Sequence, residues 1–246
     1  MSMNLIVDIG NSRMKVVVMN NDTPCAEYVG AVGDVAWLCS VVERHPEIRM
    51  AIVSASGGGE LAVFEALTQR IDYVLNFKSA TTPIPIKNGY ATPETLGADR
   101  LAAAVGGVAL FGDSDLMIVD FGTAITIDYV EGGVFKGGNI SPGVAIRFRA
   151  LADYTARLPH CSATDDVLDY GTTTVEAIEQ GVMQGITNEI EGYISSFLKK
   201  KTKKSIIFTG GDAKYFVKRI KNTIFADCEP LILGLNRILN YNAQDL

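Results

Sequence analysis

The sequence predicts an α/β fold built twice from one supersecondary unit, each copy a mixed sheet flanked by helices. Two stretches carry this prediction, because both run from an apolar strand through Ile-Val-Asp-x-Gly into a second strand: IVDIGNSRMKVVV from Ile6 and IVDFGTAITIDYV from Ile118. A second pair agrees, since VSASGGGE from Val53 and FTGGDA from Phe208 each read as a strand, a glycine turn and a helix start. We therefore expect two domains, at residues 1–113 and 114–246.

Each half contains strand and helix patterns in matching order. In the first half we expect strands at 3–7, 14–19, 25–31, 49–54 and 73–77 and helices at 34–44, 60–70 and 97–110. In the second half we expect strands at 117–119, 125–130, 133–140 and 205–208 and helices at 144–158, 174–199, 213–221 and 229–241. Asp34 is expected to cap its helix, and residues 112–114 are expected to connect the halves.

The composition is that of a globular chain with a sizeable core. Of 246 residues, 48% are hydrophobic and 20% are charged, and the formal net charge is -6. This acidic balance gives no reason to expect nucleic acid as a partner. The one basic run, KKKTKK at 199–204, is interpreted as the solvated end of a helix, with a patch for phosphate or a partner as the alternative.

Neither a zinc site nor a membrane segment is predicted. The cysteines are scattered without a Cys-x-x-Cys pair, and the chain has only two histidines. His160 and Cys161 are adjacent, but neighbouring residues rarely aim at each other, so a thiol nucleophile is not favoured. Asp8 interrupts the first apolar run, and the longest run, 101–112, is too short and glycine-rich to span a bilayer. We therefore expect a cytoplasmic protein in a reducing compartment.

The repeated turns suggest phosphate chemistry. Glycine lets the backbone approach a ligand closely, so backbone N–H groups and the hydroxyls of Ser12 and Thr123 can reach phosphate oxygens. Asp8 and Asp120 cannot bind phosphate directly, but each can hold the metal ion that accompanies a nucleoside triphosphate. One such turn alone is better explained as a tight hairpin. Two copies in the same register favour a nucleotide that is gripped from both sides.

The order and spacing of the motifs narrow this interpretation. The duplicated pattern resembles the actin-like (ribonuclease H-like) superfamily of acetate and sugar kinases, heat-shock chaperones and actin. Within it, the chain resembles the type III pantothenate kinases. The motifs that carry this resemblance are Asp8-x-Gly10-Asn11-Ser12-x-x-Lys15, Tyr90, Gly97-x-Asp99-Arg100, Asp120-x-Gly122-Thr123-Ala124-x-Thr126, Gly137-Gly138-x-Ile140-x-Pro142-Gly143 and Thr209-Gly210-Gly211-Asp212. Ser12 stands where the family more often has threonine, a difference that keeps the hydroxyl.

The resemblance implies ATP-dependent phosphorylation of pantothenate to 4'-phosphopantothenate, the first step of coenzyme A biosynthesis. It implies that ATP is bound by Asp8, Gly10, Asn11, Ser12 and Lys15 of the first loop and by Thr123 of the second. Asp120 would bind a monovalent cation, potassium or ammonium, while magnesium would arrive with ATP. The alternative for Lys15 is an exposed strand lysine without a ligand.

The resemblance also implies an acceptor site. It implies that pantothenate is bound by Tyr90, Gly97, Ala98, Asp99, Arg100 and Thr174. Asp99 would be the general base, and Arg100 suits an acceptor that carries a carboxylate. The alternatives are that Asp99 caps its helix, that Arg100 forms a structural salt bridge and that Tyr90 is an exposed loop residue.

Thr174 is the least specific of these assignments. It matches the family's acceptor-side threonine or serves as the N-cap of the long helix, and Thr172 and Thr173 stand beside it. Family members are similar in forming homodimers. The small residues Gly181, Gly185 and Gly192 on the long helix fit either a close contact between subunits or packing within one chain.

Three other functions compete with this interpretation. A chaperone or filament protein of the same superfamily would need large insertions for which this chain has no room. A regulatory relative that binds ATP without catalysis is another alternative, although the intact Asp8, Lys15, Asp99, Arg100 and Asp120 argue against it. Within enzymes, the rival is a kinase for a different small hydroxy acid.

Overall fold

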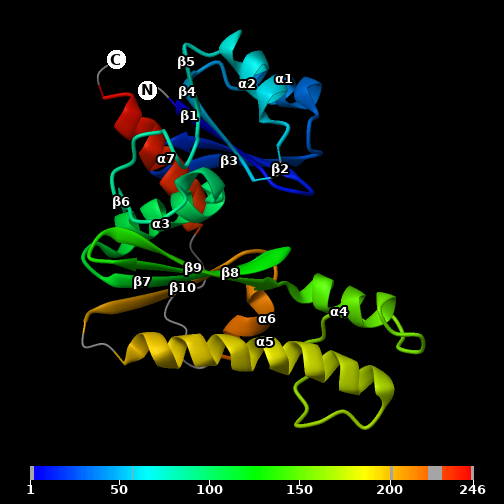
Figure 1. Cartoon of the computed structure of the whole chain (residues 1–246). Helices are drawn as coiled ribbons and strands as arrows, with labels where there is room; N and C mark the ends of the chain where they lie inside the picture. Colours follow the sequence, from blue (N-terminus) through cyan, green and yellow to red (C-terminus); the bar gives the residue numbers. More distant parts are fainter. Residues whose placement is uncertain (1–2, 57, 200–201, 221–228, 245–246) are drawn as a thin grey trace. The chain divides into compact units, whose positions relative to one another are not determined.

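The computed structural model describes residues 3–56, 58–199, 202–220 and 229–244 (Figure 1). The chain divides into two compact units. Unit 1 comprises Met1–Gly112, Gly133–Phe135 and Glu229–Leu246, and unit 2 comprises Asp113–Gly132 and Lys136–Cys228. Parts of the predicted glycine loop, basic run and penultimate helix, at Gly57, 200–201 and Lys221, lie outside the described residues.

Unit 1 contains a five-stranded mixed sheet in the order β3-β2-β1-β4-β5. Its strands are β1 (Met3–Ile9), β2 (Met14–Asn20), β3 (Thr23–Gly30), β4 (Ile48–Ala55) and β5 (Tyr73–Asn76). Its helices are α1 (Val35–Glu43), α2 (Glu60–Thr68), α3 (Ala98–Phe111) and α7 (Pro230–Asn242), with a short 3-10 helix at Pro93–Thr95. The short strand β6 (Lys87–Asn88) pairs with Val134 and Phe135, the first residues of β9 (Val134–Pro142). As predicted, Asp34 caps α1, because its side chain accepts a hydrogen bond from the Trp37 N–H.

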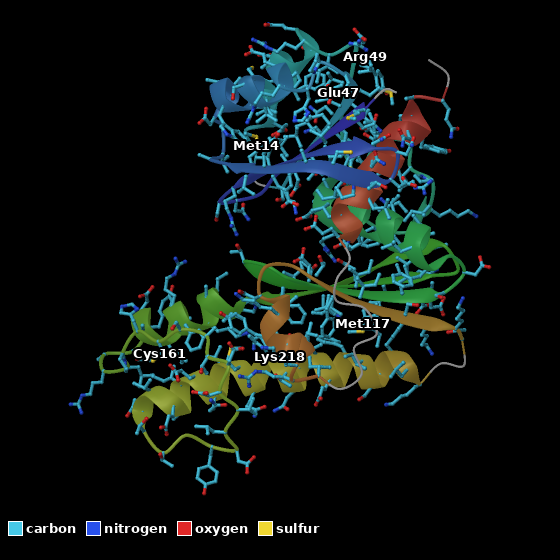
Figure 2. All side chains as sticks on the ribbon, turned by 180° about the vertical axis from the view of Figure 1, so that it is seen from behind. Met14, Glu47, Arg49, Met117, Cys161 and Lys218 are labelled. Atoms are coloured by element: carbon cyan, nitrogen blue, oxygen red, sulfur yellow. The ribbon has the colours of Figure 1, made fainter. Side chains whose placement is uncertain are left out.

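The two faces of the first sheet are packed differently. Val7 of β1 and Met14 of β2, the latter labelled in Figure 2, belong to an apolar core completed by α1 and α2. On the other face Asn4 of β1 donates from Nδ2 to Oδ1 of the buried Asn236 in α7, at 2.7 Å. Side chains alternate along a strand, so Asp8 lies on the same face as Asn4. Asp8 is therefore directed to the α7 side of the sheet.

Helix α7 is fixed to α3 by a close backbone approach. A Cβ on Gly106 of α3 would lie 1.9 Å from the Pro230 carbonyl oxygen, and a Cβ on Gly234 of α7 would lie 1.8 Å from the Ala102 carbonyl oxygen. The two helices lie side by side in Figure 1. This contact explains why the C-terminal helix belongs to unit 1, whereas we had expected residues 114–246 to form one domain.

Unit 2 repeats the topology of unit 1. Its strands are β7 (Asp115–Phe121), β8 (Ala124–Glu131), most of β9 and β10 (Lys204–Thr209), and its helices are α4 (Val144–Asp153), α5 (Thr174–Leu198) and α6 (Ala213–Val217). The order β9-β8-β7-β10 reproduces β3-β2-β1-β4, with β7 antiparallel to β8 and parallel to β10. Even the register repeats, since Asp8 lies opposite Ser54 of β4 and Asp120 lies opposite Thr209 of β10.

The core of unit 2 lies between its sheet and α5. Met117 of β7, labelled in Figure 2, packs in one cluster with Met183, Ile186 and Ile190 of α5, and all four are buried. The helix that follows β9 ends at Asp153, five residues before the predicted Leu158. Within the described ranges, none of the helices combines the length and the apolar run that crossing a bilayer would require.

Candidate active site

The first phosphate loop is the hairpin between β1 and β2. The N–H of Gly10 donates to the Arg13 carbonyl oxygen at 3.0 Å and closes the turn, which leaves Asn11 and Ser12 exposed. Asp8 and Lys15 lie directly opposite each other in the antiparallel register. Opposed residues project to the same face of a sheet, so the carboxylate and the ammonium group share one face. The structure thus brings together the five first-loop residues that the sequence predicted.

Lys15 is held by two carboxylates that are distant in sequence. Its Nζ lies 2.6 and 2.7 Å from the two oxygens of Glu229, the N-cap residue of α7, and 3.0 Å from Oε1 of Glu27 on β3. Burial lowers the pKa of Lys15, but hydrogen bonds and charge attraction from Glu229 and Glu27 outweigh it, so the pKa is raised overall. Sequence reasoning missed Glu229, because no local pattern pairs residues 214 positions apart.

Asp99 lies in the first turn of α3, where the helix dipole favours a carboxylate. Its Oδ1 accepts a hydrogen bond from the Arg100 N–H at 2.8 Å. A Cβ on Gly97 would lie 2.5 Å from the same oxygen, so glycine leaves the room that this carboxylate occupies. The half-buried Asp99 therefore interacts with the N-terminus of its own helix. This contact is the one expected if Asp99 caps α3, and it does not exclude a role as general base.

Arg100 and Tyr90 are brought together by α3 and the loop that precedes it. The Arg100 guanidinium is only 7% exposed and lies over the Tyr90 ring, 5.8 Å from its centroid. The Tyr90 N–H donates to Oδ1 of Asn88 at 3.0 Å, and its ring lies 6.1 Å from that of Phe135. A cation over an aromatic face at this distance is weakly attracted and oriented by it.

The second phosphate loop, between β7 and β8, is enclosed by glycines of unit 2. The Gly143 N–H donates to the Thr123 carbonyl oxygen at 3.1 Å, and a Cβ on Gly143 would lie 2.3 Å from the Gly122 carbonyl oxygen. Thr123 itself is exposed. A Cβ on Gly210 would lie 2.3 Å from Oδ1 of Asp120, and the φ of Gly210 is +93°, which favours glycine. The motif that the sequence noted after β10 thus packs directly on the Asp120 carboxylate.

Asp120 offers oxygen ligands for a hard cation. Its carboxylate is bordered by the backbone of Gly122 and Gly210, and hard cations prefer carboxylate and carbonyl oxygens. Across the described residues no cluster of three or more His, Cys, Asp or Glu side chains is arranged to hold a metal ion. Asp120 and the backbone beside it therefore present oxygen donors of the kind that a hard cation takes.

Thr174, the remaining residue predicted to contact the acceptor, is the first residue of α5. The N-cap of this helix is Thr173, not Thr174, because the Thr173 hydroxyl accepts from the Glu176 N–H at 3.2 Å in a capping box. Glu176 also accepts hydrogen bonds from the backbone and the hydroxyl of Thr172, both at 2.8 Å. These bonds lower the pKa of the Glu176 carboxyl. Thr172 and Thr173 are therefore used by the helix terminus.

Thr174 lines an apolar groove between α4 and α5. The groove has a volume of about 850 Å³, and its other lining residues are Arg147, Ala150, Leu151, Tyr154, Thr155, Leu158, Ala177, Ile178, Gly181 and Val182. Tyr154 on its rim is 89% exposed. A Cβ on Gly181, Gly185 or Gly192 would meet nothing within 4 Å, so these glycines do not serve close packing within the described chain.

Known proteins resemble the chain over nearly its full length. A family model for type III pantothenate kinase matches residues 4–196. A type III pantothenate kinase from Porphyromonas gingivalis W83 is 40% identical to the chain, and the match covers 98% of this chain and 100% of that protein. A type III pantothenate kinase from Phocaeicola vulgatus is 38% identical, and the match covers 98% of this chain and 99% of that protein.

Solved structures with little sequence identity share the fold. A Baf family protein from Campylobacter jejuni has a TM-score of 0.62 at 22% identity, covering 98% of this chain and 100% of its own. The ROK hexokinase of Thermus thermophilus has a TM-score of 0.54 at 11% identity, covering 98% and 99%. The prediction of duplicated actin-like domains with flanked mixed sheets is thus confirmed. Because the family model spans most of the sequence and the relatives match it end to end, the chain belongs to the type III pantothenate kinase family.

Proposed function

We infer that the protein is an ATP-dependent pantothenate kinase, the activity for which its family is named. The reaction transfers the γ-phosphoryl group of ATP to the primary hydroxyl of pantothenate and yields ADP and 4'-phosphopantothenate, the first step of coenzyme A biosynthesis. Family membership supports this activity, and kinases of this kind use ATP with a divalent metal ion. The observation that carries the residue assignment is the start of α3, where Asp99, Arg100 and Tyr90 are gathered.

Asp99 is the proposed general base. The acceptor hydroxyl donates a hydrogen bond to its carboxylate and passes its proton there as the new O–P bond forms. The bond between the γ-phosphorus and the bridging oxygen of ADP breaks in the same step. The position of Asp99 in the first turn of α3 supports this role, because the helix dipole attracts a carboxylate there.

Arg100 is proposed to bind the carboxylate of pantothenate. Its planar guanidinium can donate two parallel hydrogen bonds to a carboxylate, which orients the acceptor as well as attracting it. The Tyr90 ring under the guanidinium supports its orientation. Gly97 and Ala98 complete the proposed acceptor site by letting the backbone at the helix start approach the substrate.

The nucleotide is proposed to bind to both phosphate loops. Asn11 and Ser12 offer exposed amide and hydroxyl donors for its phosphate oxygens, and Thr123 offers another exposed hydroxyl. Gly10 lets the backbone of this turn approach the nucleotide, and the partly exposed Lys15 is proposed to supply a positive charge. Magnesium bound to ATP would neutralise phosphate charge, and Asp8 is proposed to help hold that ion. Asp120 is proposed to bind potassium or ammonium, which supplies positive charge to the second loop.

A homodimer in the cytoplasm is the proposed form of the protein. The groove between α4 and α5 is lined mainly by apolar side chains and has the exposed Tyr154 on its rim, which supports a contact with a second copy. Thr174 lies in this groove, and its hydroxyl is proposed to contact the acceptor. The capping bonds of Thr172 and Thr173 favour Thr174 among the three neighbours.

The test is ADP formation from ATP and magnesium, with and without pantothenate. We expect pantothenate-dependent turnover that Asp99→Asn lowers by roughly 10²- to 10⁴-fold, since proton transfer by a positioned base contributes about that much. Asp34→Asn is the matched control, because asparagine is an equally good N-cap for α1. ATP binding without any pantothenate-dependent turnover would contradict the assignment and favour a regulatory relative or another acceptor.

A further inference from the structure

All three donors of the Lys15 ammonium group face carboxylate oxygens of the same chain. A lysine ammonium has three N–H donors, and Nζ of Lys15 makes three short contacts, two with Glu229 and one with Glu27. No donor is left over for a phosphate oxygen. The nucleotide can engage Lys15 only if one of these carboxylates withdraws.

The charges around Lys15 also oppose an anionic ligand. Two carboxylates face one ammonium group, so the cluster has a net charge of about -1 without ligand. A polyphosphate that approaches this cluster is repelled until a carboxylate leaves. Once Glu229 has withdrawn, only Glu27 of these two carboxylates still pairs with Lys15.

Of the two carboxylates, Glu229 is the one whose movement away from Lys15 exposes the ammonium group more. Its side chain is 56% exposed and makes no capping bond with α7, although it occupies the N-cap position of that helix. The Glu27 side chain is nearly as exposed, at 51%, but makes one contact with Lys15 where Glu229 makes two, so the withdrawal of Glu229 frees more of the ammonium group. Among the described residues, Lys15 is the side-chain partner that Glu229 gives up when it rotates into solvent.

We propose that Glu229 is an internal competitor of the nucleotide: it occupies Lys15 in the nucleotide-free protein, is displaced by the phosphates of ATP, and returns as the shorter ADP leaves. This proposal rests on the role of Lys15 in phosphate binding. Glu229 then weakens the binding of every nucleotide that uses Lys15 and promotes product release. Its effect is greatest for ADP, which has less negative charge than ATP with which to displace a carboxylate.

The test measures the Kd values of ADP and of a non-hydrolysable ATP analogue by calorimetry, on wild-type protein, Glu229→Gln, Lys15→Met and the double variant. Glu229→Gln is expected to tighten both nucleotides by about three- to tenfold, the range of a partly exposed ion pair, and ADP more than the ATP analogue. In the Lys15→Met background the same substitution should change neither Kd. Steady-state kinetics should show a lower KM for ATP and stronger inhibition by ADP.

The matched control is Glu60→Gln. Glu60, the first residue of α2, forms a similar ion pair, with Lys78 at 2.7 Å, and belongs to neither phosphate loop, so its replacement should leave nucleotide affinity unchanged. Glu229→Ala, together with thermal unfolding of each variant, separates a change in binding from a change in stability.

Each remaining outcome argues against a definite part of the proposal. Unchanged or weaker binding in Glu229→Gln would show that Glu229 orients Lys15 for phosphate rather than competing with it. Tightening that persists without Lys15 would show direct repulsion of the nucleotide by Glu229. If Lys15→Met alone leaves both Kd values unchanged while pantothenate-dependent turnover continues, the role of Lys15 fails and the kinase assignment survives.

Discussion

At the scale of single residues, the missing Cβ of two glycines determines where two carboxylates lie. Gly97 leaves room for Oδ1 of Asp99, and Gly210 leaves room for Oδ1 of Asp120. A side chain at either position would meet a carboxylate oxygen closer than 3 Å, so the carboxylate would have to move. The glycines therefore help to position the proposed base and the proposed cation ligand.

The cation assignment gives a prediction for Asp120. Wild-type turnover is expected to be faster in potassium than in sodium, because a monovalent site distinguishes ions by size and ligand set. Asp120→Asn removes the charge that holds the cation, so turnover should fall about tenfold or more and the ratio of the potassium rate to the sodium rate should approach one. Asp113→Asn, an exposed carboxylate after α3, is the control and should keep the wild-type ratio. A full potassium preference in Asp120→Asn would place the cation elsewhere.

At the scale of elements, glycine has one role in the pair of helices α3 and α7 and the opposite role in α5. Gly106 and Gly234 allow α3 and α7 to cross with their backbones in contact, whereas the glycines of α5 meet no neighbour in the described chain. The close contact of α3 with α7 holds Asp99 and Glu229 in one unit, because Asp99 lies in the first turn of α3 and Glu229 is the N-cap residue of α7. The glycines of α5 lower the stability of that helix, because glycine loses more backbone entropy than alanine does.

The same substitution should therefore have opposite effects in the two places. Gly106→Ala is expected to lower the free energy of unfolding by about 1–3 kcal/mol, because the new methyl group would lie 1.9 Å from a carbonyl oxygen and the helices must separate. Gly192→Ala, on an exposed turn of α5, is expected to raise it by about 0.5–1 kcal/mol. Urea unfolding measures both. Equal effects of the two substitutions would mean that α3 and α7 do not cross as described.

At the scale of the whole molecule, the proposed dimer makes a prediction about mass. A protomer of 26.4 kDa should sediment at about twice that mass. Ala177→Glu places a charge in the groove between α4 and α5 and should shift the protein towards the monomer, because an interface does not bury an unpaired charge cheaply. Leu61→Glu is the control, since Leu61 on α2 is 63% exposed and lies outside the groove. A wild-type monomer, or a dimer unaffected by Ala177→Glu, would refute the proposed interface.

The sequence alone predicted whatever depends on local pattern. The two Asp-x-Gly turns indicated the duplication, and the pattern at 174–199 indicated a long helix, because strand and helix periods are properties of neighbouring residues. Whether the apolar face of that helix packs within the chain was decided by the fold. The positions of Asp8, Lys15, Asp99, Arg100 and Asp120 followed from motifs of a few residues each. The N-cap of α5 shows the limit of such patterns: three consecutive threonines fit equally well, and only the contacts of Glu176 select Thr173.

Only the tertiary structure decided what depends on distant packing. No pattern in the sequence joins Glu229 to Lys15, places α7 with the first half of the chain, or sets Gly210 against Asp120. These contacts arise because helices and strands pack by shape, and the shape of a packed pair is a joint property of residues about one to two hundred positions apart. Short motifs in the sequence therefore identified the residues of the proposed site. The fold decided that Glu229 contacts Lys15 and that the backbone of Gly210 lies against Asp120.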